Sequence, residues 1–325
     1  MRNIVFLLSA LIFLSSGVAV SKPHQPTWSE WVHQIRVEAL HQGIRPALFD
    51  QVFSNIKRPS ARVLRYDRTQ PEKRLTFLKY RNTRADSYRI LIGRRQIKKH
   101  RALLNQIARE YGVSPCFIVS LWGLETSYGS FMGSFPVIQS LSTLAYDSRR
   151  SKFFRKELFA ALHILNGGHV KQKDFKGEWA GATGQPQFLP SSWKNFAVDH
   201  NGDGKKDIWN TLEDVFASIA NYLHQHHWKT NEPWAVAVKV PSGSASHYIN
   251  SKDTLTVRQW QAKGLRTVGG QPWPRADLKA ELIRPYGGPN YLIFNNFKVI
   301  MRWNRSNYYA GTVGYLAEKI CGRSL

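Results

Sequence analysis

The stretch from Ser114 to Gly129 constrains the fold more than any other part of the chain. Ser114 is a favourable N-cap and Pro115 suits the first helical position, so the sequence predicts a helix that begins here. Gly129 offers a place for this helix to end. Between these two ends the apolar residues form one wide face, which consists of Phe117, Ile118, Leu121, Trp122 and Leu124. A chain of 325 residues is long enough to bury this face in a large core and to carry a smaller lobe as well.

One carboxylate, that of Glu125, stands near the C-terminal end of this apolar helix. The negative end of the helix dipole and the apolar neighbours both favour the neutral acid, so they raise its pKa. Such a group costs stability, but it suits a general acid that works near neutral pH. The alternative is a Glu125 that points into solvent from a frayed helix end, and this segment alone does not decide between the two interpretations.

Helical periodicity recurs over most of the chain. Helices are predicted over 27–55, 84–111 as one long helix, 151–166, 212–228 and 297–320, whereas 56–82 and 167–184 are predicted to be irregular. Short strand candidates cluster between 234 and 294. The sequence therefore predicts a mainly α protein with a small α/β lobe inserted before the C-terminal helix. We expect a helical core over 22–230 and 296–325 and a mixed lobe over 231–295.

The first 21 residues resemble a secretory signal peptide. Arg2 gives a positive start, 4–14 is a short apolar run, and small residues place cleavage after Ala19 or Ser21. No cysteine lies at that junction, so a lipoprotein anchor is not expected, and no second membrane-spanning stretch follows. We expect a periplasmic protein without an integral membrane span after cleavage, and an uncleaved leader that serves as an anchor is the alternative.

The formal net charge of +24 favours polyanionic partners, namely nucleic acid, anionic lipid or an anionic cell-wall polymer. The leader and the lack of any recognisable nucleic-acid motif argue against nucleic acid. A solvated basic surface accounts for much of this charge without any partner. The two cysteines, Cys116 and Cys321, can form a disulfide in an oxidising compartment, but sequence does not show whether they approach each other.

Four segments carry candidate site residues. In chain order they run from Val119 to Gly133, from Ala180 to Ser192, from Asp199 to Gly204 and from Asn296 to Ser306. Their order and spacing resemble the lytic murein transglycosylase B family of peptidoglycan lyases, from roughly residue 28 to the C-terminus. The resemblance implies a lysozyme-like helical core with a glycan cleft. It also implies cleavage between N-acetylmuramic acid and N-acetylglucosamine with a 1,6-anhydro product.

The resemblance also assigns roles to individual residues. It gives the general acid/base role to Glu125, and it gives substrate-binding roles to Tyr80, Arg149, Arg150, Gln187, Phe188, Asn304 and Tyr309. The chain departs from the family at two positions: Glu178 stands where Ser is usual, and Trp303 stands where Tyr is frequent. Trp303 keeps an aromatic wall, whereas Glu178 could bring a second carboxylate near Glu125. The structural alternatives are two solvated charges for the arginine pair and a core or turn role for Gln187.

A single carboxylate suffices for the chemistry if the substrate supplies the second group. The N-acetyl oxygen of the sugar can stabilise the oxocarbenium-like centre, which is a recognised exception to the two-carboxylate rule. Glu125 would protonate the leaving oxygen and then, as a carboxylate, take the proton of the sugar's own C6 hydroxyl, which has an effective-concentration advantage over water. Asn304 would hold the N-acetyl group. No cofactor is required for this chemistry.

The segment that begins at Asp199 resembles the first nine positions of an EF-hand calcium loop. Its candidate ligands are Asp199, Asn201, Asp203, Lys205 through its carbonyl, Asp207 and Asn210. Asn210 occupies the position at which an EF-hand has a bidentate Glu, so the site loses one charge and one oxygen. The sequence predicts structural Ca²⁺ binding of modest affinity, and a plain Asp/Asn/Gly turn is the alternative.

Three further functions compete with a lytic transglycosylase. They are a hydrolytic muramidase of the same fold that uses Glu178 as a second carboxylate, a cell-wall binding protein that does not cleave, and a basic nucleic-acid binder. The presence of Glu125 argues against the second of these, and the leader argues against the third. The expected partners are peptidoglycan glycan strands, with other cell-wall enzymes as further candidates and without nucleic acid.

Overall fold

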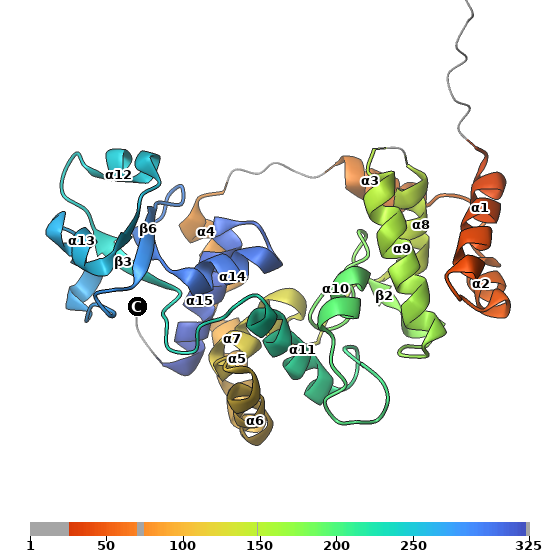
Figure 1. Cartoon of the computed structure of the whole chain (residues 1–325), viewed down its shortest axis with the longest axis horizontal. Coiled ribbons are helices and arrows are strands. Elements are labelled where there is room, and N and C mark those ends of the chain that lie inside the picture. The colour runs from red at the N-terminus through yellow and green to blue at the C-terminus, as the bar shows by residue number, and fades with distance from the viewer. Residues whose placement is uncertain (1–25, 70–74, 148, 323–325) are drawn as a thin grey trace, which may run out of the picture.

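The computed structural model describes residues 26–69, 75–147 and 149–322. The first half of the chain forms helices α1 (Trp28–His41), α2 (Pro46–Phe53), α3 (Ala61–Arg68), α4 (Phe77–Arg84), α5 (Ser87–Lys99), α6 (Arg101–Tyr111), α7 (Pro115–Thr126), α8 (Val137–Tyr146) and α9 (Ser151–Asn166). The second half adds α10 (Pro190–Phe196), α11 (Leu212–Gln225), α12 (Ala245–Ser251), α13 (Val257–Ala262), α14 (Asn295–Trp303) and α15 (Asn307–Cys321). The predicted mainly α fold is confirmed. Figure 1 shows α1 and α2 at one end of an elongated molecule and a small sheet at the other.

Several predictions about individual helices are wrong. The stretches 27–55 and 297–320 are each divided into two helices, α1 and α2 in the first and α14 and α15 in the second. The region 56–82, predicted to be irregular, contains α3 and α4, whose N-caps Ser60 and Thr76 accept hydrogen bonds from backbone N–H groups in their first turns. Each helix has eight residues and buries only one of them, Val63 or Phe77, so neither shows a periodic apolar stripe. The predicted long helix over 84–111 is two helices, α5 and α6, which are separated at His100.

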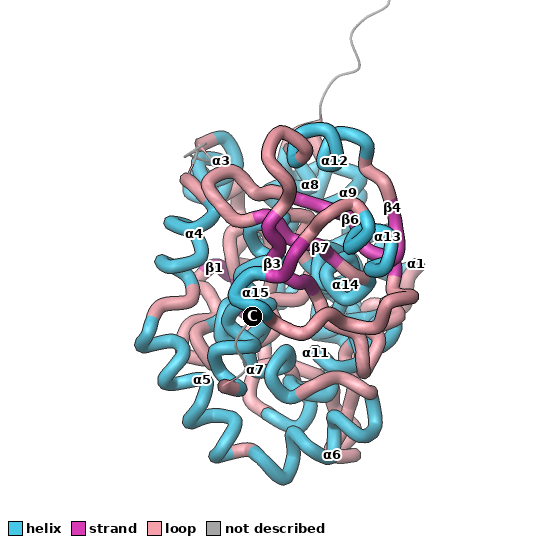
Figure 2. Tube along the Cα trace, turned by 90° about the vertical axis from the view of Figure 1, so that its left-hand side faces the viewer, coloured by secondary structure: helices cyan, strands magenta, loops and turns pink. Residues whose placement is uncertain are grey.

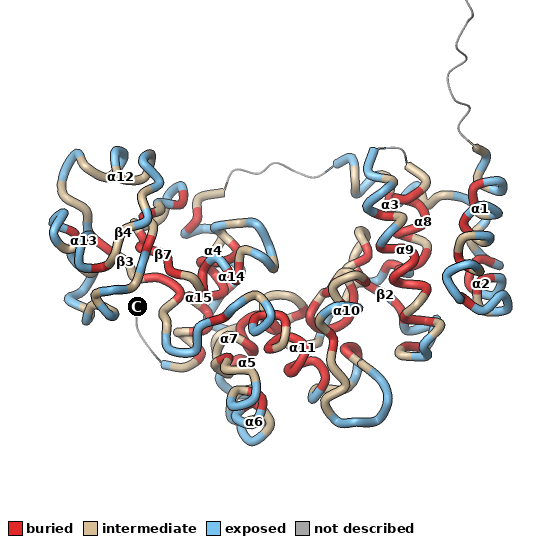
Figure 3. The backbone as a smooth tube through the Cα atoms, viewed as in Figure 1, coloured by how far each residue is buried: buried red, intermediate tan, exposed pale blue. Residues whose placement is uncertain are grey.

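Helix α7 lies in the middle of the helical core, as Figures 2 and 3 show. Its Ile118, Val119 and Leu121 have no exposed surface, and Trp122 is 3% exposed. The helix packs against α15, α5, α6 and α11. Burial on several sides means that the position of α7, and of the residues at its ends, is set by the surrounding helices.

Within the described residues, seven short strands complete the fold. β1 (Phe135–Pro136) pairs with β2 (Lys176–Gly177), which ties the segment after α7 to the segment after α9. The larger sheet has the order β4 (Thr254–Thr256), β6 (Lys279–Ile283), β7 (Asn290–Ile293), β3 (Ala235–Lys239) and β5 (Arg266–Thr267), and all of its pairs are antiparallel. This sheet and the helices α12 and α13 form the small α/β lobe before α14.

The alternation of side chains along the sheet explains how the lobe attaches to the core. On β7, Tyr291 and Ile293 belong to the hydrophobic core of the helices, whereas Leu292 and Phe294 belong to a second core within the lobe. Successive side chains of a strand point to opposite faces. One face of the sheet therefore packs on the helical core, and the other packs on the remaining residues of the lobe, including Val257 and Trp260 of α13. Figure 2 shows the strands between α15 and the lobe helices.

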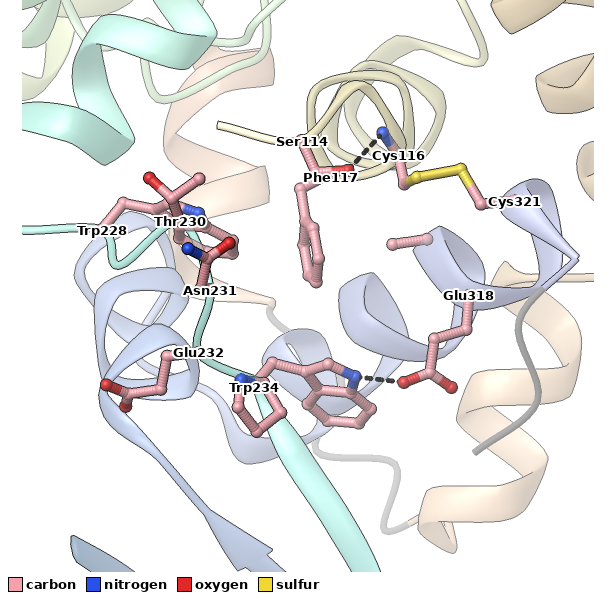
Figure 4. Close-up of a pocket in the computed structure, with 12 residues that line it drawn as sticks. Ser114, Cys116, Phe117, Trp228, Thr230, Asn231, Glu232, Trp234, Glu318 and Cys321 are labelled. Carbon is pink, nitrogen blue, oxygen red and sulfur yellow. Dashed lines mark hydrogen bonds between the residues drawn. A yellow bond between two sulfur atoms is a disulfide. The ribbon is translucent and has the colours of Figure 1, made fainter. Parts of the chain in front are cut away.

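The two cysteines form a disulfide. Cys116 in the first turn of α7 is bonded to Cys321 at the end of α15, with 6.0 Å between their Cα atoms. Figure 4 shows this bond at the edge of a cavity of about 460 Å³, which lies at the opposite end of α7 from Glu125. No helix within the described ranges is long and apolar enough to cross a membrane. The predicted signal peptide lies outside the described residues.

Candidate active site

The chain turns back on itself directly after α7, and the contacts of this turn fix the C-terminal end of the helix. Ser127 and Tyr128 both have positive φ angles, 50° and 62°, which end the helix directly after Thr126. The Tyr128 ring folds back onto Gly123, where a Cβ atom would lie 2.6 Å from the ring, and its hydroxyl donates to the carbonyl oxygen of Arg89 at 2.7 Å. Because these contacts fix the last turn of α7, Glu125 in that turn has a defined direction.

Two side chains from the C-terminal part of the chain donate hydrogen bonds to Glu125. The Tyr309 hydroxyl and the Trp303 indole N–H, the latter at 2.8 Å, both donate to Oε1 of the carboxylate. Oε2 has no hydrogen-bonding partner among the residues that the structure describes. Glu125 is partly exposed. The arrangement therefore holds one carboxylate oxygen and leaves the other for an incoming group.

Burial raises the pKa of Glu125 to about 7. The hydrogen bonds from Tyr309 and Trp303 and the positive charge of Arg84 lower this pKa, but burial has the larger effect. The raised pKa that the sequence predicts is thus present, and loss of water around the carboxylate is its main cause. A group of this pKa is protonated in a large part of the molecules at neutral pH and can also work as a base.

Aromatic side chains from separate elements surround the carboxylate. The Trp303 ring lies 5.2 Å from the Phe188 ring and 4.7 Å from the Tyr222 ring, measured between centroids. Tyr80 on α4 lies close enough for the negative charge of Glu125 to raise its pKa, although burial is the main cause of that rise. Rings of this kind can pack against the C–H faces of sugars while their polar groups form hydrogen bonds.

The Gly-rich loop between β2 and α10 packs against the C-terminal end of α7. Gln187 has a positive φ of 54°, and its amide donates to the carbonyl oxygens of Met132 at 3.1 Å and Gly184 at 2.8 Å. Gln185, which sequence reasoning missed, is 7% exposed, and its Oε1 accepts the Trp122 indole N–H at 2.7 Å. A signal for Gln185 was present, since it precedes Gln187 by two residues in the same motif.

Sequence reasoning also missed Arg84 and Tyr222. Arg84 stands at the end of α4 within reach of both Tyr80 and Glu125. Tyr222 is 7% exposed, and its hydroxyl donates to the carbonyl oxygen of Arg302 at 2.8 Å, directly before Trp303. Neither belongs to the four motifs, so only the fold brings them to the site.

Glu178 follows β2 at the crossing of two loops. A Cβ atom on Gly133 would lie 2.1 Å from the carbonyl oxygen of Gly177 and 2.7 Å from the backbone nitrogen of Glu178, so only glycine permits this approach. The backbone N–H of Glu178 donates to the carbonyl oxygen of Ala182 at 2.8 Å. The backbone at Glu178 is therefore well defined, and no ion pair holds its carboxylate within the described part of the chain.

Asn304 occupies the break between α14 and α15. It is exposed and has an extended backbone with φ −143° and ψ 119°. The N-cap of α15 is Ser306, whose side chain accepts a hydrogen bond from the backbone N–H of Tyr309. The Asn304 amide is therefore not the helix cap, and it stands next to Trp303 with its side chain open to solvent.

The predicted arginine pair is bound by carboxylates of the chain itself. Arg149 and Arg150 both pair with Asp67 on α3, whose side chain is 3% exposed. Arg149 also contacts Asp147 at 3.3 Å. The side chains of the two arginines remain about half exposed, at 52% and 54%. These arginines are therefore not free solvated charges, and a substrate carboxylate would have to share them with Asp67.

The Asp199 loop has the turn geometry of a cation-binding loop. Gly204 at its sixth position has a φ of +83°, and its backbone N–H donates to Asp199 Oδ2 at 2.8 Å. Asp199 Oδ1 also accepts the N–H of Gly202, and Asp203 Oδ1 accepts the N–H of Lys205. Within the described ranges no three His, Cys, Asp or Glu side chains lie close enough to hold a metal ion. This backbone geometry suits an Asp/Asn/Gly turn as well as a cation loop, and the carboxylates of Asp199, Asp203 and Asp207 do not form a metal-binding cluster.

Buried Asp214 on α11 anchors this loop, and sequence reasoning missed it. It has no exposed surface, and its two oxygens accept the backbone N–H groups of His200 at 2.7 Å and Asp207 at 2.8 Å. The amide of Asn210, the weak twelfth position, donates to Asp207 at 3.2 Å. The loop is therefore held in shape by hydrogen bonds that need no metal ion.

Comparison with known proteins places these features in a family context. A family model described as "Transglycosylase SLT domain" matches residues 27–318. Membrane-bound lytic murein transglycosylase B of Escherichia coli (strain K12) is 34% identical over 222 residues, which is 67% of this chain. The matched stretch spans 60% of the length of that protein.

Solved structures agree with this match. SltB3 of Pseudomonas aeruginosa, crystallised with NAG-anhNAM-pentapeptide, superimposes with a TM-score of 0.87 at 37% identity, covering 91% of this chain and 80% of that one. The Escherichia coli lytic transglycosylase Slt35 in complex with calcium superimposes with a TM-score of 0.76 at 29% identity, covering 89% and 92%.

Proposed function

The chain belongs to the SLT-domain transglycosylase family, and from this premise we propose that it is a peptidoglycan lytic transglycosylase. Its substrate is the β-1,4 bond between N-acetylmuramic acid and N-acetylglucosamine, and its products carry 1,6-anhydromuramyl ends. The observation that carries the proposal is the environment of Glu125. Its pKa is raised to about 7 by burial, and Tyr309 and Trp303 hold a single oxygen of its carboxylate.

Glu125 acts first as an acid and then as a base. The proton on Oε2 passes to the glycosidic oxygen as the bond to C1 of the muramyl sugar breaks. The N-acetyl oxygen of the same sugar stabilises the positive charge at C1. The Glu125 carboxylate then accepts the proton of the C6 hydroxyl while the C6 oxygen bonds to C1, which closes the anhydro ring and restores the acid. Oε1 keeps its two donors throughout, since both protonation states of the carboxylate can accept them.

The remaining site residues bind the glycan in this proposal. The amide of Asn304 holds the N-acetyl group, and the aromatic side chains of Tyr80, Phe188, Trp303 and Tyr309 face the sugar rings. Gln187 supports the floor of the site, since its own amide is used by Met132 and Gly184. Arg149 and Arg150 receive a carboxylate of the muramyl lactate or the peptide stem, in competition with Asp67.

The Asp199 loop binds Ca²⁺ in a structural role with modest affinity. Asp199, Asn201, Asp203 and Asp207 supply side-chain oxygens, Lys205 supplies its carbonyl and Asn210 replaces the bidentate Glu of an EF-hand. The positive φ of Gly204 and its hydrogen bond to Asp199 support this assignment. The ion takes no part in the reaction.

The enzyme works in the periplasm, where its leader directs it, and its partners are glycan strands and other cell-wall enzymes. The strongly basic composition suits a cell-wall polymer that carries carboxylates. A hydrolytic muramidase is the second candidate function, because Glu178 stands where the family usually has Ser and a second carboxylate could activate water.

Mass spectrometry of the products released from purified peptidoglycan tests the proposal. We expect anhydromuramyl ends from the wild type, the same product from Glu178→Ser, and no product from Glu125→Gln. Reducing muramyl ends that disappear in Glu178→Ser would identify a hydrolase. Binding of glycan without cleavage by the wild type would identify a cell-wall binding protein.

A further inference from the structure

Helices α7 and α15 run in opposite directions and are joined near both ends. Near the start of α7, Cys116 is bonded to Cys321 at the end of α15, as Figure 4 shows. In the middle of α7, the hydroxyl of buried Ser120 donates to the carbonyl oxygen of Val313 at 2.7 Å. A covalent bond and a buried hydrogen bond therefore fix how far α7 is shifted along α15.

The third link between the two helices is part of the active site. Glu125 in the last turn of α7 accepts the hydroxyl of Tyr309 in the first turn of α15. The disulfide, the Ser120 hydrogen bond and the Glu125 carboxylate follow one another along α7. Their partners follow one another along α15 in the reverse order.

Helix α15 is itself fixed against other elements by two large rings. A Cβ atom on Gly311 would lie 2.9 Å from the Phe77 ring, and one on Gly314 would lie 2.3 Å from the Trp234 ring. The Trp234 indole N–H also donates to Glu318 at 2.6 Å, and Figure 4 shows this bond and the disulfide among the residues that line the same cavity. Because these rings occupy the gaps that the glycines leave, α15 is a fixed reference along which α7 is placed.

We propose that the Cys116–Cys321 disulfide and the Ser120 hydroxyl are positioning groups for the Glu125 carboxylate, a role that rests on the function proposed above. They hold α7 in the register at which Tyr309 reaches Oε1. A hydrogen bond between two oxygens is made only at about 2.5–3.0 Å, so a shift of the helix by about 1 Å breaks it, whereas apolar side chains can adjust to such a shift. A helix is stiff along its axis, and the constraint at Cys116 is therefore transmitted to Glu125.

The groups that face Glu125 come from several elements. Among them, only Tyr309 lies on α15, the helix that the disulfide joins to α7. Tyr80 and Arg84 belong to α4, and Tyr222 of α11 stands next to Tyr309. Trp303 belongs to the end of α14. A change of the register between α7 and α15 should therefore reach Glu125 mainly through the hydrogen bond from Tyr309.

The test is a carboxyl-carbon NMR titration of Glu125 without substrate, with the signal assigned by its loss in Glu125→Gln. Tyr309→Phe should raise the pKa of Glu125 by about one pH unit, because a hydrogen bond to a charged acceptor is lost. The double variant Cys116→Ala/Cys321→Ala should raise it by about half a pH unit. Tyr309→Phe added to that background should then raise it by less than it does in the wild type, since the two changes act on one hydrogen bond. An unchanged pKa in the disulfide-free variant, or two shifts that add fully, would overturn the proposal.

Two further variants keep the result interpretable. Ser120→Ala retains the disulfide and should raise the pKa in the same direction, and it decides the question if the disulfide-free variant does not fold. Ile35→Val removes one methylene from a buried residue of α1 and should lower stability without moving the titration. The titration needs no cleavage, so a protein that fails to cleave peptidoglycan contradicts the proposed function while leaving the positioning role to be judged by its own measurement.

Discussion

At the scale of single residues, the site depends on how Glu125 is surrounded. Burial opposes ionisation, while Tyr309 and Trp303 favour it by donating to Oε1. The balance leaves the pKa at about 7, where neither the acid nor the base is strongly favoured at neutral pH. A group that must give a proton in one step and take one in the next benefits from such a balance.

Glu125→Gln should become more stable than the wild type as the pH rises. The folded state keeps Glu125 protonated from the ordinary Glu pKa of about 4.3 up to about 7, so wild-type stability is lost as the pH rises through this window. The glutamine does not ionise and avoids this loss. Allowing for the partial exposure of Glu125, we expect a gain of about 2 kcal/mol at pH 8 relative to pH 5. Thermal melts of both proteins at the two pH values measure it, and equal differences at both would show that burial does not oppose ionisation here.

Asn304→Ala should slow cleavage strongly at little cost in stability. The amide is exposed and Ser306 caps α15, so removal of the amide leaves the helix start intact. Ser306→Ala is the matched control and should lower stability by about 1 kcal/mol with a small effect on turnover per folded molecule. The two variants are compared by urea unfolding and by product release. If Asn304→Ala unfolds more easily yet cleaves normally, its role is structural.

At the scale of elements, two loops rather than two helices meet at the C-terminal end of α7, which carries Glu125. Gly129 and Gly133 allow the segment after α7 to touch the loop 177–188, where any Cβ would collide with Gln185 or with the backbone of Gly177. The Asp199 loop then connects α10 to α11 and is held in shape by buried Asp214. Loops that are fixed by glycines and buried polar groups can thus carry site residues as firmly as helices do.

Ca²⁺ should raise the thermal midpoint, and Asp199→Ala/Asp203→Ala should abolish this response. An ion that binds only the folded loop stabilises the protein in proportion to the logarithm of its concentration. Because Asn210 replaces the bidentate Glu of an EF-hand, we expect the effect to need Ca²⁺ well above micromolar concentration, or about 10⁻⁴–10⁻³ M. Melting curves in Ca²⁺, Mg²⁺ and chelator provide the measurement. Identical curves in Ca²⁺ and chelator would show that the segment is only a turn.

At the scale of the whole molecule, one sheet separates two hydrophobic cores. The helical core contains α7, while the lobe core contains Trp260, Val257 and Leu292, all without exposed surface. The site residues belong to the helical side of this boundary, on α4, α7, α11, α14 and α15 and in the breaks between elements. The lobe contacts the helices that carry the site through the sheet, through the start of α14 and through the β6–β7 loop, where the carbonyl oxygen of Tyr286 accepts the backbone N–H of Phe77 at the start of α4.

Trp260→Ala should loosen the lobe and leave α7 protected from hydrogen exchange. The indole is fully buried and donates to the carbonyl oxygen of Ala280 at 3.0 Å, so its loss should cost about 3–5 kcal/mol of local stability. Hydrogen exchange should accelerate in β4 and β6 but not in α7. Phe216→Ala is the matched control, since this ring is fully buried in the helical core, and it should accelerate exchange in α7. Faster exchange throughout the molecule in Trp260→Ala would show that the two cores unfold as one.

The family, the mainly α fold and the small lobe could be predicted from the sequence. Four motifs in the right order identified the family, and the match over 27–318 confirms it. The short basic helices α3 and α4 could not be predicted, because each buries a single residue and depends on neighbours that are remote in sequence. The break at His100 was missed for a different reason, because the apolar spacing of the sequence continues through it. The roles of the individual site residues remain predictions that the experiments above address.

Residues that are close in sequence determined α7 by themselves: its cap, its proline, its apolar face and the carboxylate in its last turn. These depend on local geometry and on periodic spacing, which a sequence displays directly. Only the tertiary structure decided that Tyr309 and Trp303 share one oxygen of Glu125, that Asp67 holds the arginine pair, and that Cys116 meets Cys321. Hydrogen bonds, ion pairs and disulfides require atoms within a few ångströms, and for residues 82 to 205 positions apart that proximity is created by the packing of the whole chain.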